Sequence, residues 1–182
     1  MHELSYRLME DALTRLSHPK TLVLDVGSLD INGSFRALIE GKGWRYIGLD
    51  IVQGKNVDVV AEPFCYPFPD YCFDAVISGC TMEHITAIWE WVPELVRILK
   101  PGGLLVIETH THFKEHRYPV DCWRVLPDGL RYLFDRTGGL EDYVIKTEAT
   151  DIVGSAFKKE GARNIGCFLG SVQNVVPTFI YS

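Results

Sequence analysis

Two short apolar runs, each carrying an acidic residue at or near its end, constrain the fold of this chain more than any other feature. Residues 22–26 include Asp25 and lead into Gly27, and residues 46–49 lead into Asp50. Short apolar runs bounded by turns are typical of buried parallel strands. At the edge of such a sheet, a glycine turn brings backbone close to a ligand, and a carboxylate on the next strand can accept hydrogen bonds from ribose hydroxyls. The two runs therefore predict half of a nucleotide-binding α/β sheet.

The rest of the chain alternates helical and strand patterns, which indicates parallel strands joined by helices. We predict helices over residues 3–17, 33–40, 82–99 and 127–136, and strands over residues 21–26, 45–49, 57–60, 73–78 and 104–108. Segments at about 141–149 and 164–180 are expected to close the sheet as an antiparallel pair. Residues 100–103 are predicted to form a turn, and residues 109–126 a polar loop.

Length, charge and cysteine spacing limit the class of protein. The 182 residues are expected to form a single domain over residues 1–182. We predict a cytoplasmic protein, because the N-terminus lacks the apolar core of a signal peptide and the sequence contains no apolar run long enough to span a membrane. The net charge of −6 argues against a nucleic-acid partner. The five cysteines include no Cys-x-x-Cys pair, so a zinc knuckle is not expected.

Four segments in this order resemble the motifs of the class I S-adenosylmethionine-dependent methyltransferases, in particular the type 11 group. They are Val23-Leu24-Asp25-Val26-Gly27-Ser28, Ile47-Gly48-Leu49-Asp50, Pro67-Phe68-Pro69-Asp70 with Phe73-Asp74-Ala75-Val76-Ile77-Ser78, and the turn and strand at residues 99–107. The resemblance implies a three-layer, Rossmann-like α/β fold. Its sheet would have seven strands, mostly parallel, with an antiparallel C-terminal strand. It also implies an enzyme that uses S-adenosylmethionine as its methyl donor.

The same resemblance implies a set of cofactor-binding residues. Asp25 would order the glycine loop, Asp50 would bind the ribose, and Glu62 would lie near the adenine. The full predicted set is Asp25, Gly27, Ser28, Gly33, Asp50, Ile51, Ala61, Glu62, Ser78 and Gly79.

The glycine loop departs from the family pattern at one position. Leu29 stands where the family usually has glycine, and Gly33 comes late. Asn32 and Gly33 both tolerate positive φ, so together they can restore the turn. The altered loop leaves open a second hypothesis, a non-catalytic relative that only binds the cofactor. It also disfavours a nicotinamide-dependent oxidoreductase, because the Gly-x-Gly-x-x-Gly spacing is absent.

A histidine-rich segment follows the strand at residues 104–108. His110, His112 and His116 are candidate general bases, because imidazole titrates near neutral pH and ligands of open parallel sheets bind at the carboxyl ends of the strands. Two alternatives stay open: a metal site built from Glu108, His110 and His112, and a structural or gating role. We assign no metal ligands from the sequence.

The methyl acceptor is expected to contact a loop beyond these histidines. Residues 118–130 resemble a Tyr-Pro-x-Asp-x-Trp-Arg segment found in a subset of small bacterial and archaeal methyltransferases. We predict His84, Trp123 and Arg124 as substrate-binding residues. The Pro-Pro-aromatic motif of DNA amino-methyltransferases is missing after Ser78, which argues against methylation of DNA bases. A small polar acceptor is therefore favoured over a macromolecule. We expect methylation at oxygen. The oligomeric state is not predicted.

Overall fold

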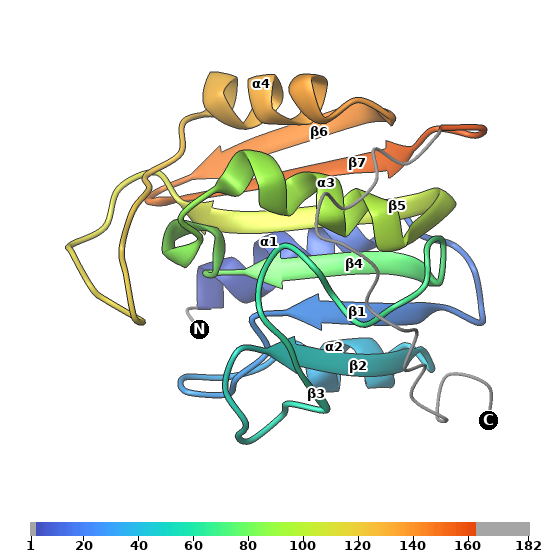
Figure 1. The fold of residues 1–182 in the computed structure, drawn as a ribbon, viewed down its shortest axis with the longest axis horizontal. Coiled ribbons are helices and arrows are strands. Elements are labelled where there is room, and N and C mark those ends of the chain that lie inside the picture. Colours follow the sequence, from blue (N-terminus) through green and yellow to red (C-terminus); the bar gives the residue numbers. More distant parts are fainter. Residues whose placement is uncertain (1–2, 163–182) are drawn as a thin grey trace.

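A seven-stranded sheet forms the centre of the computed structural model, which describes residues 3–162 (Figure 1). The strand order is β3-β2-β1-β4-β5-β7-β6. β1 to β5 run parallel, whereas β7 runs antiparallel to both β5 and β6. The strands are β1 (Leu22–Val26), β2 (Arg45–Asp50), β3 (Val59–Val60), β4 (Phe73–Gly79), β5 (Leu99–His110), β6 (Leu140–Glu148) and β7 (Asp151–Lys158). The predicted fold class, a mostly parallel sheet with an antiparallel C-terminal strand, is confirmed.

Helices cover both faces of this sheet and complete a three-layer architecture. They are α1 (Glu3–Leu13), α2 (Arg36–Gly41), α3 (Ile88–Ile98) and α4 (Pro127–Thr137), with a 3₁₀ turn η1 (Met82–His84). Buried side chains of α1 and α2 pack in one apolar cluster with alternate residues of β1, β4 and β5, and those of α3 and α4 pack in a second cluster on the opposite face. Figure 1 shows α3 in front of the sheet and α1 and α2 behind it. None of the helices between residues 3 and 162 is long and apolar enough to cross a membrane.

The predicted helix over residues 82–99 was wrong as one continuous element. The chain forms η1, then an extended residue at Ile85, and α3 begins only at Ile88. The indole Nε1 of Trp123 donates a 2.6 Å hydrogen bond to the backbone oxygen of Ile85. The Ile85 oxygen therefore accepts its hydrogen bond from a distant loop and not from a backbone N–H of a following helical turn. The break leaves η1 at the edge of the sheet, where it contributes to the site described below.

The predicted turn at residues 100–103 lies inside β5, which begins at Leu99. Gly102 adopts φ +72, and the register between β4 and β5 shifts between Phe73 and Ala75, so the glycines make an irregularity within the strand rather than a turn before it. At its other end the strand extends to His110. His110 is thus a strand residue, not a loop residue as predicted.

Among residues 3–162, the antiparallel partner of β6 is β7, which the sequence did not predict as a strand. The predicted strand at residues 164–180 lies outside the described residues. A tight turn at Ala149 and Thr150 joins the two strands, with Glu148 opposite Asp151. Asp151, Gly154 and Ser155 interrupt the apolar pattern of β7. They are buried all the same, because β7 lies inside the sheet between β5 and β6.

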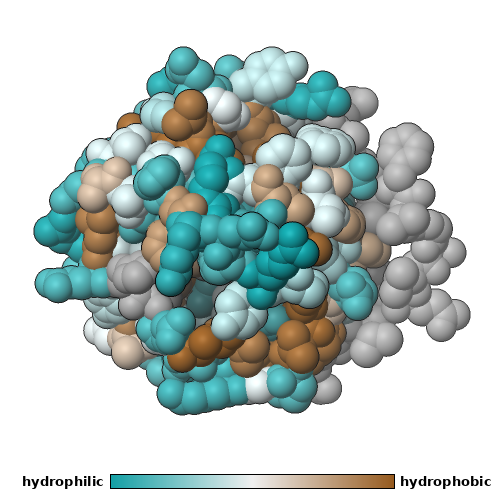
Figure 2. Space-filling view, turned by 90° about the vertical axis from the view of Figure 1, so that its left-hand side faces the viewer, coloured by the Kyte–Doolittle hydropathy of each residue, from teal (hydrophilic) through white to brown (hydrophobic). Residues whose placement is uncertain are grey.

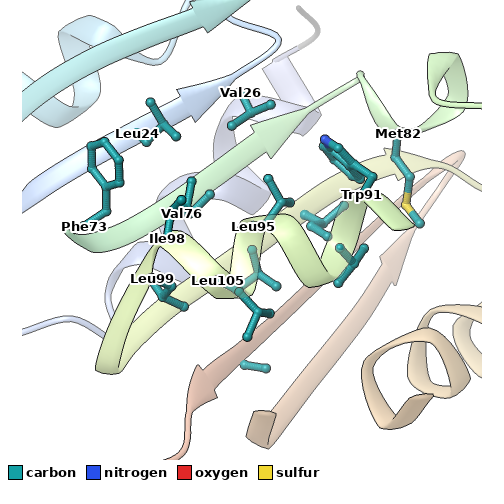
Figure 3. Close-up of a cluster of buried hydrophobic side chains, with 14 of the residues drawn as sticks. Leu24, Val26, Phe73, Val76, Met82, Trp91, Leu95, Ile98, Leu99 and Leu105 are labelled. Atoms are coloured by element: carbon teal, nitrogen blue, oxygen red, sulfur yellow. The ribbon is translucent and has the colours of Figure 1, made fainter. Parts of the chain in front are cut away.

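The core between α3 and the sheet includes a buried polar pair. Figure 3 shows Trp91 and Leu95 of α3 facing Val26 of β1 and Val76 of β4. Trp91 is fully buried, and its Nε1 donates a 2.7 Å hydrogen bond to the hydroxyl of Tyr66. The pair fastens α3 to the segment that connects β3 and β4.

Replacing Trp91 with phenylalanine should lower the free energy of unfolding by about 1–3 kcal/mol, since the buried Tyr66 hydroxyl loses its donor and a smaller ring leaves a void. Urea unfolding followed by circular dichroism would measure the change. The matched control is Trp89→Phe, at a side chain that is 46% exposed, for which a change below about 0.5 kcal/mol is expected. Equal losses in both variants would contradict the assigned role of the Trp91–Tyr66 pair.

Candidate functional site

A cavity of about 620 Å³ opens at the carboxyl ends of the parallel strands. Its volume is within the range of small-molecule sites. Figure 2 looks at this edge of the molecule, where hydrophilic side chains gather across the centre and hydrophobic ones lie along the lower side. Because β2, β1, β4 and β5 are successive neighbours, the loops that follow them line the cavity in that order. Asp50 therefore marks one end, Gly79 the middle, and His116 the other end.

At the first end, the carboxylate of Asp50 faces the cavity beside two exposed apolar side chains. Its Oδ2 accepts the backbone N–H of Leu29 at 3.1 Å and its Oδ1 accepts that of Val52 at 3.2 Å. Each carboxylate oxygen can accept more than one hydrogen bond, so Asp50 keeps capacity for a ligand. Ile51 and Val52 line the cavity and are 41% and 53% exposed, an apolar surface suited to cover a flat ring.

The glycine loop follows the wall of the cavity despite its unusual sequence. Gly27 adopts φ +83, and a Cβ there would lie 1.9 Å from the Oγ1 of Thr81, so only glycine fits without rearrangement. Leu29 lines the cavity, and its side chain lies against Gly54, where a Cβ would lie 2.3 Å from Leu29 Cδ1. Because Gly54, on the neighbouring loop, has no side chain, there is room for the leucine beside it. The glycine loop ends at Gly33, which adopts a positive φ and donates its backbone N–H to Asp30 Oδ1.

The predicted cofactor-binding residues divide into two groups. Gly27, Gly33, Asp50, Ile51, Ala61 and Gly79 line the cavity, whereas Asp25, Ser28, Glu62 and Ser78 do not. Ser28 and Ser78 donate hydrogen bonds to the backbone oxygens of Asn56 and Val26. Ser28 thus joins the glycine loop to the loop between β2 and β3, and Ser78 joins the ends of β4 and β1.

Asp25 lies beneath the glycine loop, on the face of the sheet that α1 and α2 cover. Burial raises the pKa of its carboxyl to about 7, and the Tyr46 hydroxyl, which donates a 2.6 Å hydrogen bond to Oδ2, offsets part of that effect. Asp25 thus supports the loop from below without lining the cavity.

At the opposite end, two imidazoles face the cavity. The ring centroids of His84 and His116 are 4.9 Å apart. His84 Nδ1 lies 2.6 Å from the Val120 oxygen, and His116 Nδ1 lies 3.1 Å from the Lys114 oxygen. A carbonyl can only accept, so both Nδ1 atoms carry hydrogen and both Nε2 atoms present a lone pair in the neutral rings.

The other two predicted bases occupy different positions. His110 is buried and does not line the cavity; its Nδ1 lies 2.8 Å from Oδ1 of Asp151. His112 is exposed and lies outside the cavity lining. The structure thus brings His116 to the cavity, places His110 behind it, and turns His112 to the surface.

Trp123 and Arg124, predicted to bind substrate, do not line the cavity. Trp123 fastens the loop to Ile85, as described above. Arg124 forms two short hydrogen bonds, of 2.6 and 2.8 Å, with the carboxylate of Asp121, and they hold the pKa of that carboxyl well below its usual range. Asp121 also accepts the backbone N–H of His116 at 2.7 Å. In this structure the pair shapes the loop that carries His116.

Three buried carboxyl groups lie under the histidine end, and sequence reasoning did not single out two of them. Glu83 is fully buried; its Oε2 accepts a 2.8 Å hydrogen bond from Thr109. Asp151 accepts from Ser5 at 3.2 Å. Burial, reinforced by the charge of Asp151, raises the pKa of Glu108 to about 8. Glu83 could have been predicted as a site residue because it precedes His84 in the sequence. Asp151 could not, because it is far from the other site residues in sequence and is brought to them by β7.

The chain is similar to known methyltransferases in sequence and in fold. Residues 24–107 match the sequence model of a family described as a methyltransferase domain. A 2-methyl-6-phytyl-1,4-hydroquinone methyltransferase of Synechocystis sp. is 29% identical over 153 residues, which are 74% of this chain and 47% of that protein. The chloroplastic tocopherol O-methyltransferase of Arabidopsis thaliana is 35% identical over 106 residues, 50% of this chain and 30% of that protein. The chain spans less than half the length of these two relatives.

Solved structures share the fold. A SAM-dependent methyltransferase from Archaeoglobus fulgidus superposes with a TM-score of 0.65 at 19% identity, covering 84% of this chain and 94% of the other. The 1,6-didemethyltoxoflavin-N1-methyltransferase of Burkholderia thailandensis gives a TM-score of 0.65 at 18% identity, covering 87% and 78%.

Proposed function

Starting from the class I S-adenosylmethionine-dependent methyltransferase domain that this chain carries, we propose that it methylates a small hydroxyl-bearing acceptor at oxygen. One observation supports this proposal above all. A single cavity joins a carboxylate suited to ribose, Asp50, to a pair of imidazoles, His84 and His116. Donor and acceptor can therefore bind side by side, and their proximity supplies much of the rate of a displacement reaction.

The residues at the first end fit S-adenosylmethionine. Asp50 would accept hydrogen bonds from the ribose hydroxyls, Ile51 and Ala61 would contact the adenine, and the backbone at Gly27 and Gly79 would border the methionine part. Leu29 does not block the cavity, since its side chain lies against Gly54. When bound, the cofactor supplies an electrophilic methyl group on a sulfonium.

The residues at the second end act on the acceptor. A hydroxyl must lose its proton to become a strong nucleophile, and imidazoles near neutral pH are suited to bind, orient and deprotonate it. His84 and His116 are the imidazoles that line the cavity, beside Ile85, Tyr118 and Pro119. A polar end flanked by apolar side chains suits an acceptor with a hydroxyl on a largely apolar body.

The relatives support a hydroxyl-bearing acceptor. The Synechocystis protein is named for a hydroquinone and the Arabidopsis protein for O-methylation of tocopherol. A ubiquinone/menaquinone biosynthesis C-methyltransferase of Methylococcus capsulatus, 26% identical over 148 residues, is named for methylation at carbon. Product analysis by NMR would separate the two: a methyl bonded to oxygen is expected, and a methyl bonded to a ring carbon would overturn the assignment of the acceptor atom.

Calorimetric titration is the first test of the proposed function. S-adenosylmethionine and S-adenosylhomocysteine should each bind at micromolar concentration, with NAD as the negative control. Binding of both adenosyl ligands and not of NAD would support the proposal and justify a screen of hydroxyl-bearing acceptors. Absence of binding would show that the loop around Leu29 no longer accepts the cofactor, and the chain would then be a degenerate relative that neither binds the cofactor nor transfers a methyl group.

A further inference from the structure

Three side chains at the acceptor end converge on one point. Glu83 Oε1 is buried and has no hydrogen-bond partner within the described part of the chain. His116 Nε2 lies 4.0 Å from it, and one ligand atom from each of Glu83, His84 and His116 can be chosen so that all three lie within 4.8 Å of one another. His84 and His116 line the cavity and the fully buried Glu83 does not, so the three ligand atoms lie at the wall of the cavity.

The hydrogen bonds around the two imidazoles resemble those of a metal-binding centre. Metal-binding histidines usually donate their second ring N–H to a carbonyl or carboxylate, which fixes the tautomer. Val120 and Lys114 supply those carbonyls here. Thr109 likewise fixes the other carboxylate oxygen of Glu83, and Oε1 lies 3.5 Å from Nε2 of His110 and 4.0 Å from Nε2 of His116.

The local charge also favours a cation. Glu83, Glu108 and Asp151 are buried together, and between residues 3 and 162 no lysine or arginine nitrogen lies within ion-pair distance of any of them. His110, tied to Asp151 and 3.5 Å from Glu83 Oε1, is the basic side chain among these carboxylates. Burial keeps Glu108 largely protonated and Asp151 is paired with His110, so the charge that a divalent ion would compensate is that of Glu83.

We propose that Glu83, His84 and His116 bind a divalent transition-metal ion at the acceptor end of the cavity. Two imidazole nitrogens and one carboxylate oxygen form a donor set typical of Zn²⁺ and its neighbours, with at least one position left open. The two nitrogen donors disfavour Mg²⁺ and Ca²⁺, which prefer oxygen ligands. Bonds of about 2.0–2.1 Å require donor atoms about 3.4 Å apart. Glu83 Oε1 and His116 Nε2, now 4.0 Å apart, would therefore approach by about 0.6 Å, and no pair, since all lie within 4.8 Å, by more than about 1.4 Å.

The inferred ion deepens the proposed function and rests on it. An acceptor hydroxyl bound at the open position would lose its proton to water near neutral pH, because a coordinated oxygen is much more acidic than a free one. His116 would then serve as a ligand, and the ion would hold the oxygen beside the methyl donor. The body of the acceptor would lie along Ile85 and Tyr118.

Metal titration of tag-free protein tests the inference without any acceptor. Co²⁺ followed by its visible absorption, then displaced by Zn²⁺, should show one site of micromolar affinity or tighter. His116→Ala and Glu83→Gln should each weaken Co²⁺ binding by more than the roughly 10–100-fold that loss of an outer-shell partner costs. His18→Ala, which removes an exposed histidine near the amino end of β1, is the matched control and should bind like the wild type.

The outcomes are distinguishable from failure of the proposed function. No Co²⁺ or Zn²⁺ binding by the wild-type protein, or equal binding by His116→Ala and His18→Ala, would overturn the metal site even if S-adenosylmethionine binds. Metal binding without cofactor binding would instead overturn the methyltransferase proposal. Should Glu83→Gln unfold, the wild-type titration and His116→Ala, which changes a partly exposed loop residue, still decide the question.

Discussion

Asp50→Ala should weaken binding of S-adenosylmethionine by about 100-fold or more. Two hydrogen bonds from ribose hydroxyls to a carboxylate are each worth about 1.5–3 kcal/mol, and alanine removes both. The same carboxylate accepts the backbone N–H groups of Leu29 and Val52, so its loss also loosens the glycine loop over the ligand. Both effects act in the same direction, and calorimetry or equilibrium dialysis would measure their sum.

The control for this variant is Glu10→Ala, which removes an exposed carboxylate from α1 and changes the net charge equally. Its affinity for the cofactor should match that of the wild type. Asp50→Asn keeps one oxygen acceptor and should fall between the two. An Asp50→Ala protein that is folded and binds the cofactor like the wild type would refute the placement of the ribose.

His116→Ala should lower kcat by about 10²–10⁴-fold, the usual effect of losing the group that prepares an acceptor oxygen. Affinity for S-adenosylmethionine should change by no more than about threefold, because the altered side chain lies at the opposite end of the cavity from Asp50. Formation of S-adenosylhomocysteine, with the best substrate from a panel of hydroquinones and other hydroxyl-bearing compounds, would give the rate.

The comparison with His18→Ala shows whether the loss is specific to the site, since that variant should keep the wild-type rate. A His116→Ala enzyme with normal kcat and a raised KM would mean that His116 only binds the acceptor. Normal kcat and KM together would remove His116 from the reaction altogether.

The cofactor end of the site could be predicted from the sequence because its parts are local. A glycine after one strand and an acid after the next are each fixed by their own strand ends, and Gly27 and Asp50 therefore line the cavity as the motifs indicated. Asp25 and Ser28 belong to the same motif but do not line the cavity. Which side of a strand end faces the ligand depends on the pleat, and the motif alone does not give it.

The acceptor end could not be predicted in the same way, because its geometry is tertiary. His110 and His112 lie close to His116 in sequence, yet the end of β5 buries the first and exposes the second. Glu83 reaches the histidines only because the expected helix breaks at Ile85, where a carbonyl is held by Trp123. Asp151 lies on β7, which was not predicted as a strand because polar residues interrupt its apolar pattern. Contacts between distant segments decided each of these cases.

The division of the cavity also bears on how specificity can change in proteins of this architecture. Residues 111–126 form one uninterrupted excursion between β5 and α4, and they supply His116 and Tyr118 but none of the residues at the Asp50 end. The excursion is fastened at its base where Cys122 N–H bonds to Glu83 and Val125 N–H bonds to His110. Under the proposed function, we therefore expect that replacing residues 111–126 while keeping these two anchors would change the preferred acceptor and leave the affinity for S-adenosylmethionine unchanged.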